Sequence, residues 1–179
     1  MATIQDVQQL AIKLLSQPFT FTANGETHEI SAIDLGYYFE FDKGKKAFGT
    51  CHFRKKKITL SLALCEANLD KLFTQITDTT LHEIAHAFCV HVYGTTHGRG
   101  HDWRWISIAK QIGCNGERCY SFDNVNPPKS KYTLVCNTCG RETPKHKKVT
   151  RKTACAICCK QHNFGRFSYD YLLELRVNN

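Results

Sequence analysis

The sequence predicts an α+β protein, in which a small antiparallel sheet packed with helices is followed by a separate metal-binding module. Apolar residues recur with the helical period in some segments and alternate with polar residues in others. Two prolines, Pro127 and Pro128, interrupt the chain where neither period continues. Residues 129–179 then carry two cysteine pairs, and eleven Lys and Arg against three acidic residues. We therefore expect two domains, residues 1–128 and residues 129–179.

The first part of the chain supplies the predicted sheet. Residues 3–16 form an amphipathic helix that Pro18 ends. A hairpin is expected over the stretch FTFT-ANGE-THEI, residues 19–30. Three later segments alternate apolar and polar side chains, which predicts an antiparallel meander with one buried face. These segments cover residues 37–42, 48–53 and 58–64.

Helices follow the meander. The apolar period becomes helical from about Asp70, and this helix should end near Gly94, because glycine is the usual residue after a helix. A polar loop, GTTHGRG, and a second helix over residues 103–112 come next. Residues 123–131, DNVNPPKSK, are expected to link the two domains.

Composition favours a soluble intracellular protein, in the cytoplasm or, in a eukaryote, the nucleus. No run of about 18 apolar residues occurs, and the N-terminal segment lacks the apolar block of a secretory signal. In a reducing compartment, the ten cysteines are expected to be free thiols or metal ligands and not disulfides. The formal net charge of +8 resides entirely in residues 129–179. This density favours nucleic acid as a partner over an acidic protein or solubility alone. No membrane association is expected, and the chain is expected to be a monomer.

The run TLHEIAHAF, residues 80–88, places the motif H-E-x-x-H on a predicted helix. His82 and His86 are four residues apart and share one helix face, so both imidazoles can reach a single ion. Zinc accepts such nitrogen ligands, and the adjacent Glu83 can take a proton from a water molecule at the ion. The alternative is a pair of core histidines with ordinary hydrogen bonds.

A catalytic zinc needs a third protein ligand. His91 lies off the shared face, whereas His97 and His101 bracket a glycine-rich segment that can fold back toward the metal. We favour His101, because the helix after it anchors it in the core through apolar residues such as Trp105. His97 then lines the cleft, either as a hydrogen-bond donor to a developing oxyanion or as a solvated loop histidine.

The run DTTLHEIAHAF, the later GHDWRW and the IAKQIG helix together resemble the SprT-like (Spartan-type) zinc metalloprotease family. The resemblance covers about residues 35–120 and includes the strand ITLSLALCEAN. In that family an aromatic residue stands four positions after the third zinc histidine, as Trp105 does after His101, although Asp-Trp-Arg replaces the usual Gly-Pro-Glu-like residues. The resemblance implies a zincin-like protease that cleaves proteins bound or crosslinked to DNA, with a role in DNA repair and activation by the nucleic acid.

The basic module carries two C-x-x-C pairs separated by fifteen residues. Four thiolates at this spacing complete a tetrahedral structural zinc site, and binding the ion supplies folding free energy that a short module lacks. The expected ligands of this zinc ribbon are Cys136, Cys139, Cys155 and Cys158. Cys159 could replace Cys158 with a wider gap, but the two-residue spacing favours Cys158. Disulfides are the alternative and need an oxidising compartment.

Between the pairs lies KHKKVTRK, which is expected to form an exposed basic hairpin. The candidate phosphate contacts are Lys145, Lys147, Lys148, Arg151 and Lys152. Four aromatic residues follow, Phe164, Phe167, Tyr169 and Tyr171. They could stack on bases, but their alternation favours a strand with one packed face. The remaining cysteines are assigned no metal: Cys114 and Cys119 lack a second pair, and Cys51, Cys65 and Cys89 are isolated in sequence.

The sequence thus predicts a DNA-associated zinc endopeptidase with one catalytic and one structural Zn²⁺. One alternative is a nucleic-acid-binding or transcription-associated scaffold with a non-catalytic histidine site. Another is a zinc hydrolase that acts on a different bond. Glu83 favours an enzyme over a scaffold, because a purely structural site has no need of a carboxylate beside its ligands.

Overall fold

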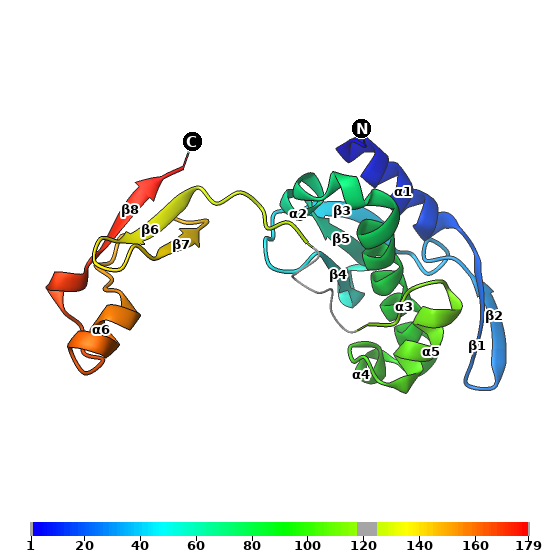
Figure 1. Ribbon diagram of the computed structural model, residues 1–179. Helices are drawn as coiled ribbons and strands as arrows, with labels where there is room; N and C mark the ends of the chain where they lie inside the picture. The colour runs from blue at the N-terminus through cyan, green and yellow to red at the C-terminus, as the bar shows by residue number, and fades with distance from the viewer. Residues whose placement is uncertain (1, 118–124, 179) are drawn as a thin grey trace. The chain divides into compact units, whose positions relative to one another are not determined.

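The computed structural model describes residues 2–117 and 125–178 of the chain (Figure 1). Two compact units divide the chain, Met1–Pro128 and Lys129–Asn179. Both combine helices with small sheets, so the predicted α+β class is confirmed. Among the described residues, no helix has the length and apolar character needed to span a membrane.

The first unit opens with a helix and a hairpin, as predicted. Helix α1 (Ile4–Ser16) starts at a capping box, in which the Thr3 hydroxyl accepts from the Asp6 N–H and the Asp6 carboxylate accepts from the Thr3 N–H. Strands β1 (Phe19–Ala23) and β2 (Glu26–Ile30) pair antiparallel. Asn24 and Gly25 form the turn between them, and both have the positive φ that a tight two-residue hairpin turn requires.

The predicted antiparallel meander is wrong in its strand order. Strand β5 (Lys57–Ser61) lies between β3 (Tyr38–Asp42) and β4 (Gly49–His52), parallel to β3 and antiparallel to β4 (Figure 1). The polar residues of β5 explain the difference, because Thr59 and Ser61 are buried as well. Thr59 donates to the Asp42 carboxylate at 2.8 Å, and Ser61 donates to the Gly44 carbonyl at 2.6 Å. The connection between β3 and β4 therefore packs on β5, which becomes the central strand of a mixed sheet.

The strand predicted to reach Leu64 ends at Ser61. The Ser61 hydroxyl accepts from the Leu64 N–H at 3.2 Å and caps helix α2 (Leu62–Ala67). Leu64 is buried, but as a helical residue. The apolar residues at every second position up to Leu64 predict a strand, but the Ser61 cap starts a helix at Leu62 instead. A short 3-10 turn η1 (Phe53–Lys55) separates β4 from β5.

One long helix was predicted after α2, and the structure has three segments there. The 3-10 turn η2 (Leu69–Lys71) and the π-helical stretch η3 (Leu72–Ile76) precede α3 (Thr77–Tyr93). Helix α3 ends at Gly94, as predicted, with a positive φ of 79°. Ile84, Ala85 and Phe88 are fully buried, so α3 lies at the centre of the larger hydrophobic cluster.

The segment between the two predicted helices is not entirely a loop. It contains one helical turn, α4 (Thr95–Gly98), which contacts α3. Helix α5 (Trp103–Gln111) then begins at Asp102, whose side chain accepts from the Arg104 N–H. Trp105 and Ile108 are fully buried and join α5 to the same cluster as α3.

The described part of the predicted linker begins within the first unit. Val125 is buried in the second hydrophobic cluster. The Asn126 N–H donates to Asn68 Oδ1 at 2.7 Å, and Asn68 Nδ2 donates to the Asn126 carbonyl at 2.9 Å. Residues 123 and 124 of the predicted linker lie outside the described residues. Residues 125 and 126 of the predicted linker therefore pack on the first unit and are not part of a free linker.

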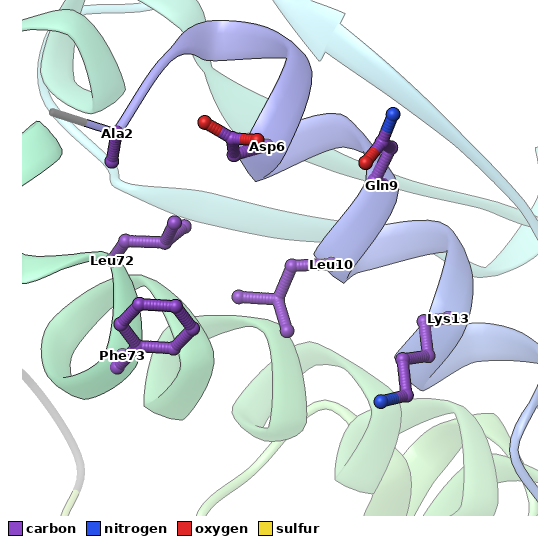
Figure 2. Close-up of a pocket in the computed structure, with 7 residues that line it drawn as sticks. All are labelled: Ala2, Asp6, Gln9, Leu10, Lys13, Leu72 and Phe73. Carbon is purple, nitrogen blue, oxygen red and sulfur yellow. The ribbon is translucent and has the colours of Figure 1, made fainter.

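A shallow groove of about 450 Å³ lies between α1 and η3 (Figure 2). Leu10 and Leu72 line it, and Phe73, 82% exposed, stands at its side. None of the predicted ligands lines this groove. It is therefore separate from the candidate metal site.

The second unit is a three-stranded antiparallel sheet with one helix. Strand β6 (Tyr132–Cys136) lies between β7 (Glu142–Lys145) and β8 (Leu173–Val177). Helix α6 (Ala156–His162) and the 3-10 turn η5 (Tyr169–Tyr171) lie between β7 and β8 in the chain. The buried cluster consists of Cys136, Cys155 and Cys158, with Ile157, Tyr171 and Leu173 packed against it. Thiols thus provide much of this small core.

The predicted strand of alternating aromatic residues is wrong. Phe164 lies in a turn after α6, and Tyr169 lies in η5. Positive φ at both Phe164 and Gly165 excludes an extended strand there. Tyr171 packs against the cysteine cluster, whereas Phe164, Phe167 and Tyr169 are exposed.

Candidate metal centres

Three histidine rings converge on one point in the first unit. His82 and His86 come from successive turns of α3, and His101 comes from the segment just before α5. The Nε2 atom of His101 lies 3.0 Å from that of His82 and 3.1 Å from that of His86. An ion about 2.0–2.1 Å from each nitrogen requires separations of about 3.0–3.4 Å between nitrogens, so the cluster fits zinc.

Backbone carbonyls orient two of the rings. His86 donates from Nδ1 to the Gly98 carbonyl at 2.7 Å, which leaves its Nε2 unprotonated and available to a metal. The backbone of Glu117 also hydrogen-bonds the ring of His82. Such partners fix both the tautomer and the direction of a metal-binding imidazole.

Trp105 forms a common apolar wall for the cluster. Its ring centroid lies 4.5 Å from that of His82, 5.2 Å from that of His86 and 4.6 Å from that of His101. Burial lowers the pKa of His82 to about 3 and that of His86 to about 4, and the neighbouring histidines add to the effect. Both imidazoles are therefore neutral near pH 7, which is the form that binds a metal.

Glu83 is buried beside the histidine cluster, with 7% of its surface exposed. Its carboxylate accepts a hydrogen bond from the Cys51 backbone N–H of β4. Burial raises the pKa of Glu83 to about 8, and a cation at the histidines would lower it again. Gly49, also on β4, leaves the space that this side chain fills, because a Cβ there would stand 2.9 Å from Glu83 Cγ and 3.0 Å from Oε1.

The two other histidines of this region lie outside the cluster. His97, in α4, is half-buried, and its Nδ1 accepts from the Arg104 guanidinium at 3.2 Å. Arg104 also donates to the Asp102 carboxylate at 2.7 Å. His97 is therefore neither a third ligand nor a solvated loop residue. His91 is exposed on α3, with its ring edge-on to that of His28.

Four thiols form a second cluster, in the second unit. The Sγ atoms of Cys136 and Cys158 lie 3.7 Å apart, as do those of Cys139 and Cys155. All four ligand atoms lie within 4.8 Å of one another. Cys159 is buried nearby but is not a member of this group. Tetrahedral sulfur ligands at these separations suit a structural zinc ion.

Backbone N–H groups support the thiolate form in two of these residues. The N–H groups of Cys139 and Thr138 lower the pKa of Cys136 to about 6. Those of Cys158 and Ile157 lower the pKa of Cys155. Burial among the other sulfur atoms raises the pKa of Cys158, so its thiolate is disfavoured unless a cation is bound.

The predicted phosphate contacts begin at Lys145, the last residue of β7, and continue along the segment after it. Lys145 is half-buried, and Lys147, Lys148, Arg151 and Lys152 are exposed. Within the described residues, none of the five forms an ion pair with a carboxylate. The basic hairpin expected over residues 145–152 is wrong, because residues 146–152 contain no strand and β7, which pairs with β6, ends at Lys145.

The other cysteines that the structure describes are not part of either cluster. Cys51, Cys65 and Cys89 are buried free thiols. Cys114 is buried near the Asp78 carbonyl, and Cys119 lies outside the described residues. Sequence reasoning missed three positions: the carbonyls of Gly98 and Glu117, and the open space at Gly49. Backbone groups and empty volume leave no signal in residue types.

Comparison with known proteins agrees with the geometry of the first unit. The model of one protein family, described as SprT-like, matches residues 16–129. No curated protein and no solved structure matches the chain. The matched range contains all three histidines of the cluster and Glu83, and ends where the second unit begins.

Proposed function

Because this chain belongs to the SprT-like family, we propose that it is a zinc-dependent endopeptidase acting on proteins bound or crosslinked to DNA. The observation that carries the proposal is the histidine cluster, whose Nε2 atoms lie 3.0 and 3.1 Å apart beside a buried carboxylate. A structural zinc site usually has four protein ligands, whereas a catalytic site keeps one position for water or substrate. Three histidines with Glu83 adjacent match the second type.

The residues of the site have separate roles in this proposal. His82, His86 and His101 would hold zinc, which would supply Lewis acidity toward the scissile carbonyl and lower the pKa of a water molecule to about 7. Glu83 would accept a proton from the attacking water and return it to the leaving amine. The Gly98 carbonyl keeps His86 in the tautomer that ligates through Nε2.

The second unit is the DNA anchor of the proposed enzyme. It carries the whole excess of positive charge. Among the described residues, the Lys and Arg side chains of segment 146–152 form no ion pair with a carboxylate. Such groups bind phosphates and release counterions. Zinc at the four cysteines would hold the segment in place. The free thiols agree with a reducing compartment, the cytoplasm or a nucleus.

The test incubates the zinc-loaded protein with a DNA-binding protein as substrate, with and without DNA. Cleavage is expected only with DNA, and Glu83→Gln should abolish it while the zinc content stays unchanged. Glu66→Gln is the matched control, because Glu66 is exposed and lies outside the site. Cleavage that survives in the Glu83→Gln variant would remove Glu83 from its role and would refute the proposed mechanism.

The anchor has its own measurement. Replacing Lys145, Lys147, Lys148, Arg151 and Lys152 together by Gln removes five charges. The slope of log K against log salt concentration for duplex DNA should then become shallower by about 4.5. An unchanged slope would place the DNA contacts elsewhere on the chain.

A further inference from the structure

A pocket of about 350 Å³ lies beside the histidine cluster in the first unit, apart from the groove between α1 and η3. Two segments of the chain form it. One runs from the end of β4 through η1, and the other follows α4. The residues that line this basic pocket are Cys51, His52, Phe53, Arg54, Lys55 and Arg99.

Contacts from both segments join the basic pocket to the candidate zinc site. The Cys51 backbone N–H donates to the Glu83 carboxylate. The Phe53 ring lies edge-on to the His86 ring, with the two centroids 6.4 Å apart. Arg99 directly follows the residue whose carbonyl accepts from His86 Nδ1 at 2.7 Å. A molecule in the pocket would therefore lie next to the residues that act on the scissile bond in the proposed enzyme.

The lining of the basic pocket carries several cations and no carboxylate. Arg54, Lys55 and Arg99 are exposed, and none of the three forms an ion pair with an acidic side chain in the part of the chain that the structure describes. Half-buried Phe53 and buried Cys51 add apolar surface. Apolar lining with a few polar or charged groups is the usual composition of a ligand pocket.

We propose that the basic pocket is a specificity subsite, which takes an acidic side chain of the substrate polypeptide next to the scissile bond. Its cations attract a carboxylate and repel Lys or Arg at the same substrate position, so the subsite selects by both attraction and repulsion. A phosphate backbone in this place would compete with the peptide for access to Glu83 and His86, so the location favours a peptide carboxylate as the occupant. The inference rests on the proposed function and adds the class of bond that is cleaved.

The experiment first measures binding, with full-length, zinc-loaded Glu83→Gln protein, so that bound peptide is not cleaved. The probes are short peptides of Ala and Ser that carry a neutral dye, blocked ends and one central Glu, Gln or Lys. A fourth probe is the Gln peptide with a free C-terminus, because a carboxylate can also come from the end of a chain. Fluorescence anisotropy gives the Kd of each probe.

The Glu peptide should bind about 5- to 30-fold more tightly than the blocked Gln peptide, the range for one or two exposed ion pairs, and the Lys peptide should bind most weakly. This preference should decline between about 0.1 M and about 1 M salt, because exposed charges are screened. Adding Arg54→Glu and Arg99→Glu together should reverse the order, so that the Lys peptide binds best. Lys13→Glu with Lys110→Glu is the matched control, because both lysines are exposed and neither lines the basic pocket.

Cleavage is the second readout. The protein with Glu83 intact, loaded with zinc and supplied with DNA, digests a mixture of peptides of varied sequence. Asp or Glu should be enriched at one position beside the cleaved bonds, and the Arg54→Glu, Arg99→Glu variant should lose this enrichment. Zinc content and the urea-unfolding midpoint should be the same in both double variants as in the unsubstituted protein, since all four positions are exposed.

Three outcomes would overturn the subsite. Equal binding of the Glu and Gln peptides, or an unchanged order in the Arg54→Glu, Arg99→Glu variant, would show that the pocket does not select a charge. Binding of the free-ended Gln peptide as tight as that of the Glu peptide would assign the pocket to a terminal carboxylate. Weaker binding of duplex DNA by that variant, without a change in peptide order, would assign it to phosphates. If the peptides bind in the expected order but none is cleaved, the proposed function fails while the binding preference stands.

Discussion

Replacing Gly49 with alanine should slow cleavage without removing zinc. Gly49 lies on the edge strand β4, opposite Leu60 of β5, and faces the side chain of Glu83. An added Cβ would stand 2.8 Å from Thr79 Cγ2, 2.9 Å from Glu83 Cγ and 3.0 Å from Glu83 Oε1. Carbon atoms in normal contact are about 3.5–4.0 Å apart. The Glu83 side chain must therefore move by roughly half an ångström or more.

The size of the effect follows from this displacement. A shift of about 1 Å in a reacting group costs about 100-fold in rate, so a loss of about 10- to 100-fold in kcat is expected. Overpacking a buried contact costs about 1–3 kcal/mol of unfolding free energy. The three histidines are not among the atoms that the new Cβ meets, so zinc affinity should be unchanged.

The assay compares kcat for cleavage, zinc content and urea unfolding in Gly49→Ala and Gly100→Ala. Gly100 is the matched control, because a Cβ there meets no atom closer than 3.8 Å although it adjoins His101. Gly100→Ala should resemble the unsubstituted protein in all three measurements. Full activity in Gly49→Ala would refute the assignment of Glu83 as the general base. Loss of zinc together with activity would show that Gly49 also supports the three histidine ligands.

Three further perturbations have definite expected results. In Gly98→Ala, a Cβ would clash with Val90, including its backbone nitrogen at 2.7 Å. The Gly98 carbonyl that orients His86 should then shift, and zinc affinity, measured by chelator competition, should fall by about 10- to 100-fold. Unchanged zinc affinity would contradict this. Asn68→Ala removes three hydrogen bonds of a fully buried side chain. It should lower the free energy of unfolding, measured in urea, by about 2–4 kcal/mol, whereas Asn126→Ala should lower it by about 1 kcal/mol or less. Equal losses would show that burial of the Asn68 amide is unimportant. A strong chelator should abolish amide-exchange protection throughout residues 129–179 but leave much of it in the first unit, because thiols form the second unit's core; protection retained in both would show that the second unit folds without metal.

The sequence predicted the class of the fold but not the order of its strands. Periodicity identified α1, the hairpin, and the ends of α3 and α5, since each depends on local apolar spacing and on terminal residues such as Gly94. Strand order depended on contacts that periodicity does not encode. The Thr59 hydroxyl binds Asp42 at the end of β3, the Ser61 hydroxyl binds Gly44 just after it, and these contacts hold β5 beside β3.

The candidate site shows the same division. His82 and His86 could be paired from their spacing on a helix, because that geometry is fixed within one turn. The sequence left His97 and His101 as two candidates, and the fold brings His101 to the pair while Arg104 engages His97. Backbone groups of Gly98, in α4, and of Glu117 complete the surroundings of the rings, and every residue type carries such groups, so no motif could have identified them.

The cysteine-rich core of the second unit has a consequence for its response to zinc supply. Withdrawal of the metal leaves all of the cationic side chains on the polypeptide, so long-range attraction to a polyanion persists in the unfolded segment. What disappears is the folded core of thiols that gives the unit its shape. Under the proposed function, a zinc-starved molecule would therefore keep its attraction to polyanions but lose the fixed arrangement of its cationic groups.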